Sequence, residues 1–442
     1  MTAFLSSNLH RRDFLKASTG LGALTLGFNT LCPPAFHRRA LAAPLDFNKK
    51  LLFIFLRGGM DGINAVIPRG DSEYNDTNRP TLFVSEAEAI DLGNGFAQLH
   101  PDFYEMSDLY ESGDLAIVHR VGYSGQSQSH FDSQQYWENG TLDRRLEVGI
   151  FNRLISASDH IRKQGFSAAA ISSGLPVALR GPRPVPNFVD PVDFRFRGDE
   201  NSINKFVGQA EGPARGLLGF YSGKQGQAGG EYRDLLYDTG VTLNETMTVL
   251  RNNNINPETY QPVNGASYSS SSFGQKCKLA AQLFKETDAQ ILGVNFGGWD
   301  THTNQSFDNL GSQVARAYEA LWKDLQSQWK DVVIFTMTEF GRTSRENGSL
   351  GTDHAEATAM FVAGGGVNGG VYNCDASTWR DGDIFSSSSG RYLRPETDFR
   401  SVLAEIFRNH LGDSDDVINV AIPGYDGLAA ERPSDYRPLG FI

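Results

Sequence analysis

Acidic and histidine side chains recur in this sequence just after short apolar runs. Carboxylates and neutral imidazoles without thiolates suit Zn²⁺, Mn²⁺ or Fe better than Ca²⁺ or a cysteine-based structural site. We therefore expect one or two divalent metal ions, with zinc or manganese preferred. A pair of ions about 4 Å apart would clamp the oxygens of a displacement at phosphorus or sulfur. The candidate metal ligands are Asp61, Asp300, His302, Glu339, Asp353 and His354.

Three further residues, Ser129, His130 and Arg342, are candidates for a direct part in catalysis. Ser129 precedes a predicted helix whose N-terminus would favour an alkoxide or a bound oxyanion, so Ser129 is a candidate nucleophile. With Asp132 three positions later, Ser129 also fits a helix N-cap with a variant of the capping box. Arg342 would either hold a non-bridging oxygen of the substrate or pair with Glu339, three residues before it.

A sheet of parallel strands would bring these residues together. Apolar runs without alternation predict buried strands at 51–56, 115–118, 168–171, 177–179, 291–296, 332–335 and 359–363. The segment 307–329 has apolar side chains every three or four residues and predicts an amphipathic helix between two of these strands. We therefore expect an α/β fold with a largely parallel sheet sandwiched between helices. Ligands of such sheets bind beyond the carboxyl ends of the strands, where the candidate residues lie.

The first 42 residues resemble an export signal. The segment from His10 to Lys16 has the twin-arginine pattern, a weakly apolar stretch follows, and Ala40-Leu41-Ala42 supplies a small-x-small cleavage site. We expect residues 1–42 to be a twin-arginine signal peptide and the protein to be periplasmic or secreted. Residues 43–442 would form one α/β domain, with an irregular, partly helical insertion at about 181–274.

Charge and apolar patterning exclude several kinds of partner. Residues 1–42 hold five basic residues and one acidic residue, so the remainder has 35 basic and 51 acidic residues and a net charge near −16. Such a charge argues against a nucleic-acid surface, and after the signal no run is long and apolar enough to span a bilayer. Cys277 and Cys374 are too few for a disulfide scaffold, and the sequence leaves open whether they pair.

Several motifs together resemble the bacterial domain-of-unknown-function 1501 family, over nearly all of the mature chain. They are the segments 56–64, 129–132, 299–305, 338–343 and 351–355. That family looks like a distant branch of the alkaline phosphatase, sulfatase and phosphoglycerate mutase superfamily, which implies an alkaline phosphatase-like fold with a two-metal site. The resemblance implies metal-ligand roles for Asp61, Asp300, His302 and His354, and it places Glu339 where the superfamily has an Asp-His pair.

Motifs and resemblance together predict an exported, metal-dependent hydrolase of phosphate or sulfate esters. Its substrate would be a small or polymeric anionic ester, and Ser129 or a metal-activated water would attack. The alternative is a non-catalytic envelope protein of the same fold, which uses its acidic, Ser- and Gly-rich surface to bind a partner or a polysaccharide. A phosphomutase is a third interpretation, against which export away from the sugar-phosphate pools argues.

Overall fold

The structure, a computed structural model, describes residues 47–163, 165–194 and 231–442. Residues Phe47–Ile442 make up one unit of the chain. The predicted signal peptide, residues 1–42, lies outside the described residues, as does the part of the predicted insertion at 195–230. Within the insertion, the described residues include the helix α9, Glu231–Asn252.

A mixed, largely parallel sheet of nine strands runs through the described residues. Its order is β11-β5-β10-β9-β1-β8-β6-β7, and β12 pairs with β5. Only β10 runs against its neighbours, β5 and β9, while the other pairings are parallel. This confirms the predicted fold class. The strands are β1 Lys50–Leu56, β5 Leu115–Gly122, β6 Ala168–Ile171, β7 Asn187–Phe188, β8 Ile291–Phe296, β9 Val332–Met337, β10 Thr358–Gly364, β11 Gly370–Tyr372 and β12 Thr397–Asp398.

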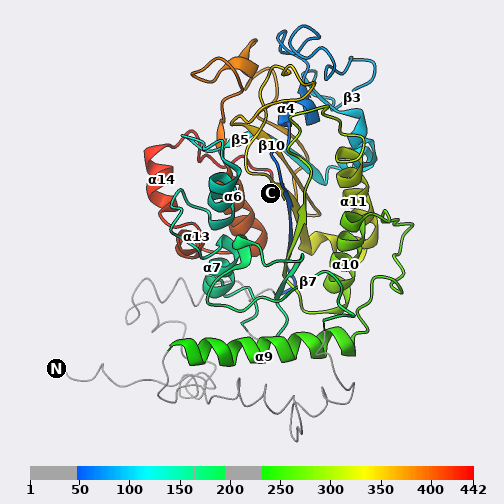
Figure 1. The fold of residues 1–442 in the computed structure, drawn as a ribbon, viewed down its shortest axis with the longest axis vertical. Helices are drawn as coiled ribbons and strands as arrows, with labels where there is room; N and C mark the ends of the chain where they lie inside the picture. Colours follow the sequence, from blue (N-terminus) through cyan, green and yellow to red (C-terminus); the bar gives the residue numbers. More distant parts are fainter. Residues whose placement is uncertain (1–46, 164, 195–230) are drawn as a thin grey trace, which may run out of the picture. The chain divides into compact units, whose positions relative to one another are not determined.

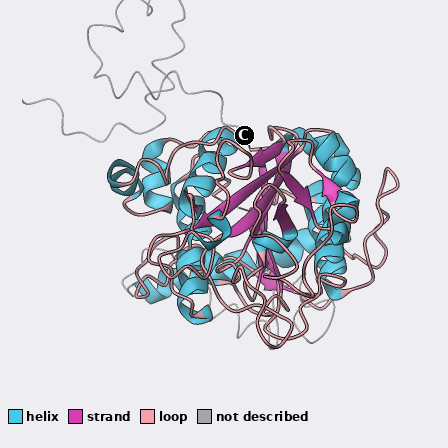
Figure 2. Cartoon of the chain, turned by 90° about the horizontal axis from the view of Figure 1, so that it is seen from above, coloured by secondary structure: helices cyan, strands magenta, loops and turns pink. Residues whose placement is uncertain are grey.

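Helices cover both faces of this sheet, because the central strand β1 is apolar on both sides. Leu52, Ile54 and Leu56 belong to one core cluster, whereas the intervening residues of β1 belong to a second cluster on the opposite face. Figure 2 shows the strands lying between helices on either side. One face is covered by α10 Ser272–Glu286 and α11 Gly311–Asp324, and the other by α6 His130–Asn139, α7 Ile150–Ala157, α12 Phe399–Ile406 and α13 Asp415–Ala421 (Figure 1).

Smaller elements complete the described chain. A second sheet has the order β2-β4-β3, with β2 Val66–Pro68, β4 Ala97–Leu99 and β3 Ile90–Asp91. The short helices are α4 Gly62–Ala65, α5 Ser107–Glu111 and α14 Tyr425–Glu431, together with the 3₁₀ turns η1 Pro101–Met106, η2 Val177–Leu179, η3 Gln326–Asp331 and η4 Asp383–Phe385, and the π-turn η5 Phe407–Leu411. No helix of the described residues has the length and hydropathy that a membrane crossing needs.

The register of the sheet brings the ends of several strands to one edge. Leu56, at the end of β1, lies beside Phe296, at the end of β8, and Phe55 lies beside Met337, at the end of β9. Strand β5 has the same direction as β9, since both oppose β10. The loops that follow these strands, and the loop that enters β10, therefore meet at a single edge of the sheet.

Local sequence signals account for several element boundaries. Helix α6 ends where Gly140 adopts a left-handed φ of 66°, a conformation that glycine takes readily after the last turn of a helix. Asp398 caps α12 by accepting a hydrogen bond from the Arg400 amide. The expected strand at 177–179 is wrong. The amide of Leu179 bonds to the carbonyl of Pro176, so this segment closes on itself as the turn η2 instead of pairing with a strand.

Two further features of the described residues bear on the sequence predictions. Cys277 and Cys374 are both buried and free.

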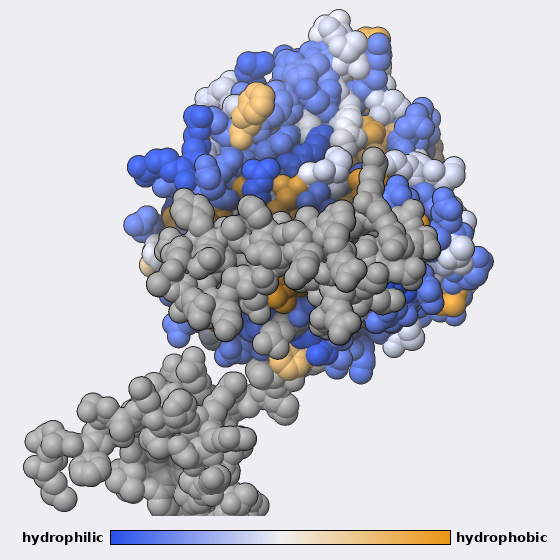
Figure 3. Space-filling model, turned by 60° about the horizontal axis from the view of Figure 1, so that its bottom comes forward, coloured by the Kyte–Doolittle hydropathy of each residue, from blue (hydrophilic) through white to orange (hydrophobic). Residues whose placement is uncertain are grey.

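The face seen in Figure 3 is mainly hydrophilic, with apolar residues scattered among polar ones outside the grey atoms. Scattered exposed apolar residues are normal for a protein surface.

Candidate metal centre

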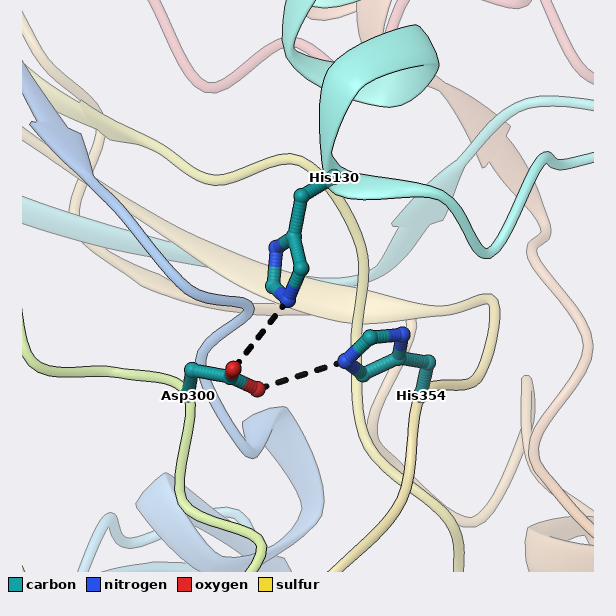
Figure 4. A group of neighbouring side chains, drawn as sticks. All are labelled: His130, Asp300 and His354. Atoms are coloured by element: carbon teal, nitrogen blue, oxygen red, sulfur yellow. Dashed lines mark hydrogen bonds and ion pairs between the residues drawn. The ribbon is translucent and has the colours of Figure 1, made fainter.

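Three imidazoles converge on the carboxylate of Asp300 at the carboxyl edge of the sheet. Asp300 Oδ1 lies 3.0 Å from His302 Nε2 and 3.2 Å from His354 Nε2, and Asp300 Oδ2 lies 3.3 Å from His130 Nε2. The ligand atoms of His130, Asp300 and His354 all lie within 4.8 Å of one another, and Figure 4 shows these three side chains facing each other. His302 joins the group through His354, since their Nε2 atoms are 2.9 Å apart.

Each of these imidazoles has its other nitrogen, Nδ1, against an acceptor. His130 Nδ1 is 2.8 Å from Glu339 Oε1, and His302 Nδ1 is 3.2 Å from Asp353 Oδ1. His354 Nδ1 is 2.7 Å from the carbonyl oxygen of Gln128. A carboxylate or a carbonyl can only accept, so Nδ1 carries the proton and donates it. In the neutral rings Nε2 then presents its lone pair toward Asp300, which is the tautomer that binds metals.

This arrangement places electron-pair donors against one another, a geometry that fits either a bound cation or added protons. The Nε2 of His130 is buried and makes no hydrogen bond, although the side chain itself is 27 % exposed. Burial acts to raise the pKa of Asp300, but the hydrogen bond and the charge of Arg342, with contributions from His354 and His130, outweigh it and hold this pKa at about 2. Asp300 is therefore an anion at neutral pH. A divalent ion or added protons would relieve the repulsion among the donors.

Arg342 anchors Asp300 to the loops around it. Its guanidinium is fully buried and donates to Asp300 Oδ1 at 2.6 Å. It also donates to backbone carbonyls, at 2.8 Å to Gly59 and at 3.0 Å to Trp299, and makes a further contact with the carbonyl of Gly58. Neither predicted role of Arg342 agrees with this placement. It does not pair with Glu339, and its burial keeps it from reaching a substrate, so it positions Asp300.

Close backbone approach beneath the site demands glycine at position 58. Gly58 has a φ of +127°, and a Cβ built there would lie 2.1 Å from the amide nitrogen of Asp300. The amide of Gly58 donates to Glu339 Oε1 at 2.8 Å. The glycines after β1 thus let the loop after β8 cross directly over them, which carries Asp300 to the imidazoles.

Phe340 supports two of the imidazoles with its buried ring. The ring centroid of Phe340 lies 4.9 Å from that of His130 and 4.5 Å from that of His354. An isolated antiparallel bridge between Arg342 and His354 fixes the backbone on this side. Packing and bridge together hold two of the converging rings in place.

Asp61 lies apart from the converging group, in a buried ion pair with Arg79. Both side chains are fully buried, and the carboxylate is 2.7 Å from Arg79 Nη1. Asp61 also accepts from Gln305 Nε2 at 2.7 Å and from the amide of Asn64 at 3.1 Å. Burial acts to raise the pKa of Asp61, but Arg79 and these donors keep it below its usual value. Because Arg79 supplies the positive charge, the structure does not bring Asp61 to the site as a ligand.

Glu339 and Asp353 lie behind the imidazoles. The buried Glu339 accepts from Gln134 Nε2 at 2.8 Å as well as from His130. Burial acts to raise the pKa of Glu339, but these hydrogen bonds outweigh it and keep the pKa below its usual value. Asp353 accepts from Asn347 Nδ2 at 3.1 Å. Both carboxylates therefore orient imidazoles, a supporting role that metal-binding histidines commonly require.

Ser129 is the N-cap residue of α6, directly before His130, and its side chain makes no cap hydrogen bond. Its position agrees with the predicted helix start, and it directly precedes His130 of the converging group.

Sequence reasoning missed four supporting contributions: the Arg79 charge, the Gln128 carbonyl, and the side chains of Gln134 and Asn347. Arg79 lies in an irregular segment without periodicity, and the Gln128 contact comes from the backbone, so neither carries a sequence signal. Gln134 lies four residues after His130, a helical spacing that does point to the same side of α6.

A cavity of about 490 Å³ lies away from this group. It is lined by Ser167 and Ala168, where β6 begins, and by residues of α9 such as Glu245. Since the parallel strands have their amino ends there, it is at the opposite edge of the sheet.

The fold and the site define an α/β protein with a candidate metal centre at the carboxyl edge of its sheet. Residues 231–379 match the family described as "Protein of unknown function (DUF1501)", which confirms the resemblance over this part of the chain. The segments 56–64 and 129–132 lie outside the match. The matched span contains Asp300, His302 and His354, and their supporting residues Glu339 and Arg342.

One solved structure with some likeness is the lipoteichoic acid synthase LtaP from Listeria monocytogenes. The identity is 10 %, the match covers 84 % of this chain and 76 % of that chain, and the TM-score is 0.25. No curated protein matches the chain.

Proposed function

We propose that this protein is an exported, metal-dependent hydrolase of phosphate or sulfate esters. The observation that carries the proposal is the convergence of three imidazole Nε2 atoms on the Asp300 carboxylate. Three imidazoles and one carboxylate fit the preferences of Zn²⁺ and Mn²⁺. His130, Asp300, His302 and His354 would hold one ion. Asp61 would not, because Arg79 already neutralises it.

A metal ion bound there would polarise the ester and neutralise charge that develops on its oxygens. The residues of the chain have distinct tasks around it. Glu339 and Asp353 keep a proton on Nδ1 of His130 and His302, which leaves each Nε2 free to bind. Ser129 is the candidate nucleophile. Its oxygen would bond to phosphorus or sulfur while the bond to the alcohol oxygen breaks, and the hydroxyl proton would pass to the departing alcohol. Water would then hydrolyse the serine ester, which releases phosphate or sulfate and restores the hydroxyl.

The openness of the group fits a substrate that arrives from solvent. The side chain of Asp300 is 48 % exposed and that of Asp353 is 45 % exposed. Small esters and the ends or side groups of a polymeric ester would both reach such a site. The negative charge of the chain makes a metal cation the feature that attracts an anionic ester.

The test is a screen of phosphate and sulfate esters with protein that has been stripped with a chelator and reloaded with Zn²⁺ or Mn²⁺. We expect metal-dependent hydrolysis that Asp300→Asn lowers by at least about a hundredfold. Asp143→Asn is a matched control, because the Asp143 side chain is also 48 % exposed and pairs with an arginine, Arg145. It should retain full activity.

Two results would count against the proposal. One is hydrolysis that persists in Asp300→Asn, which would place the activity elsewhere. The other is a reloaded protein that neither retains metal nor hydrolyses any ester. In that case protons on the imidazoles, such as one on His130 between Glu339 and Asp300, account for the geometry.

A further inference from the structure

Leu350 combines an unfavourable backbone conformation with an exposed apolar side chain. Its φ is +59°, in the left-handed region that residues with a Cβ avoid, and the residue is 46 % exposed. Neither feature stabilises the fold, since the backbone is strained and the apolar surface stays in water. Strained residues that persist cluster at functional sites.

The other residues with this backbone conformation make Leu350 stand out. Among the described residues, six non-glycine residues have a positive φ, and four of them are asparagines, which tolerate this region. The fifth, Arg120, is buried and forms ion pairs with Asp383 and Glu396. These contacts offset its strain, whereas Leu350 leaves much of its apolar side chain in water.

The loop that carries Leu350 is tied to the candidate metal centre through Asn347. The Asn347 side chain accepts from the amides of Ser349 and Gly351, on either side of Leu350. It also donates to the carbonyl of His302 and to Asp353 Oδ1, both at 3.1 Å. One side chain therefore fixes both the strained turn and two residues of the centre.

A second exposed apolar residue borders the centre from another element. Phe131 follows His130 directly on the first turn of α6, and it is 90 % exposed. The backbone just before it contacts the centre too, since the carbonyl of Gln128 accepts from His354 Nδ1. Single exposed apolar residues are ordinary, but here one follows His130 directly on α6 and the other lies on the loop that Asn347 ties to His302 and Asp353.

We propose that Leu350 and Phe131 form an apolar rim beside the metal centre and bind the organic part of the substrate. The inference rests on the proposed function and adds a substrate class: an ester whose alcohol carries a bulky apolar group next to the phosphate or sulfate. The anionic group would bind at His130, Asp300 and His354, while the apolar group leaves water against the rim. When substrate binds, the favourable free energy of removing this apolar surface from water offsets the cost of the strained backbone at Leu350.

The test compares two anions that differ only in their organic part, methylphosphonate and phenylphosphonate. Their dissociation constants are measured by calorimetry on zinc-loaded protein. Removal of about 55 Å² of apolar surface from water corresponds to roughly a tenfold gain in affinity, so phenylphosphonate should bind about tenfold more tightly. Leu350→Asn and Phe131→Ser should each reduce this preference several-fold and leave methylphosphonate binding unchanged.

Two controls separate a role in binding from a structural one. Leu350→Asn should unfold at the same temperature as the wild type or at a higher one, because asparagine relieves the strain. Tyr104→Ser removes another exposed aromatic ring, 69 % exposed on η1, and should keep the full preference. Loss of preference in a variant that is at least as stable as the wild type supports the rim.

The possible failures are distinguishable. Equal affinity of the wild type for both anions, or a preference that survives in both variants, overturns the rim and leaves the hydrolase proposal intact. If zinc-loaded protein binds neither anion, the proposed anion site itself is wrong, and the rim falls with it.

Discussion

Glu339→Gln tests whether a buried carboxylate tunes the metal centre through His130. Oε1 of Glu339 accepts from His130 Nδ1, Gln134 Nε2 and the amide of Gly58, each at 2.8 Å. A glutamine carbonyl oxygen can accept the same three hydrogen bonds, so the substitution removes the charge and keeps the shape. The new amide nitrogen replaces Oε2, which accepts from Thr338 Oγ1 at 3.4 Å, so we expect the free energy of unfolding to fall by about 1 kcal/mol.

The affinity for metal should change more. Loss of a carboxylate behind a metal-binding imidazole typically costs about 10–100-fold in affinity, which is about 1.4–2.7 kcal/mol. The hydrogen bond to Glu339 is the main cause of the raised pKa of His130. The pKa of His130 in the metal-free protein should therefore fall in Glu339→Gln, which an NMR titration would show.

Competition with a chromophoric chelator measures the zinc affinity, and Glu405→Gln is the matched control. Glu405 is also buried and accepts from the backbone amides of Leu439, Gly440 and Phe441, on an element outside the centre. Equal zinc affinity of Glu339→Gln and the wild type would refute the reasoning. A similar loss in Glu405→Gln would also refute it, because the effect would then be general.

Three further predictions concern the framework of the site. Arg79→Met leaves the buried carboxylate of Asp61 without its partner and should cost about 3–5 kcal/mol in urea unfolding; an unchanged midpoint would contradict the ion pair. Burial lowers the pKa of His119 and of His410 to about 4. Both folded-state pKa values lie below the unfolded value of about 6.5, so the folded state favours the neutral form of each histidine. The contribution of each neutral histidine to the free energy of unfolding is complete above pH 6.5 and declines as pH falls toward 4. Each histidine should account for about 2 kcal/mol between pH 7 and pH 5, and His410→Gln should flatten the stability profile measured by urea unfolding over that range. Gly58→Ala drives a Cβ against the Asp300 backbone and should abolish zinc binding in equilibrium dialysis; full retention would show that the loops are looser than described.

The elements that position the site could be predicted from the sequence because their signals are local. The runs that became β1, β8, β9 and β10 are apolar without alternation, as strands buried on both faces must be. Parallel strands end at one edge, so residues after β1, β8 and β9 were expected together, and Asp300, His302 and His354 do meet there. The helix start at Ser129 also placed His130 on the first turn of α6.

The partners of these residues could not be predicted, because they depend on contacts between distant segments. Asp61 looked like a ligand until the structure paired it with Arg79, whose loop has no pattern that reveals this contact. Arg342 looked free for a substrate, yet it is buried among the carbonyls of Gly59 and Trp299. Which carboxylate binds directly and which supports an imidazole is decided by side-chain direction, which spacing alone does not encode.

Metal content per chain is the most direct test of the central claim. Purified protein is dialysed against trace zinc, and elemental analysis then counts ions in the wild type, Asp300→Asn, His354→Ala and the control Asp143→Asn. We predict one ion per chain in the wild type and in Asp143→Asn, and less than about a tenth of an ion in the other two. Wild-type protein without bound metal, or metal that remains in both Asp300→Asn and His354→Ala, would contradict the account.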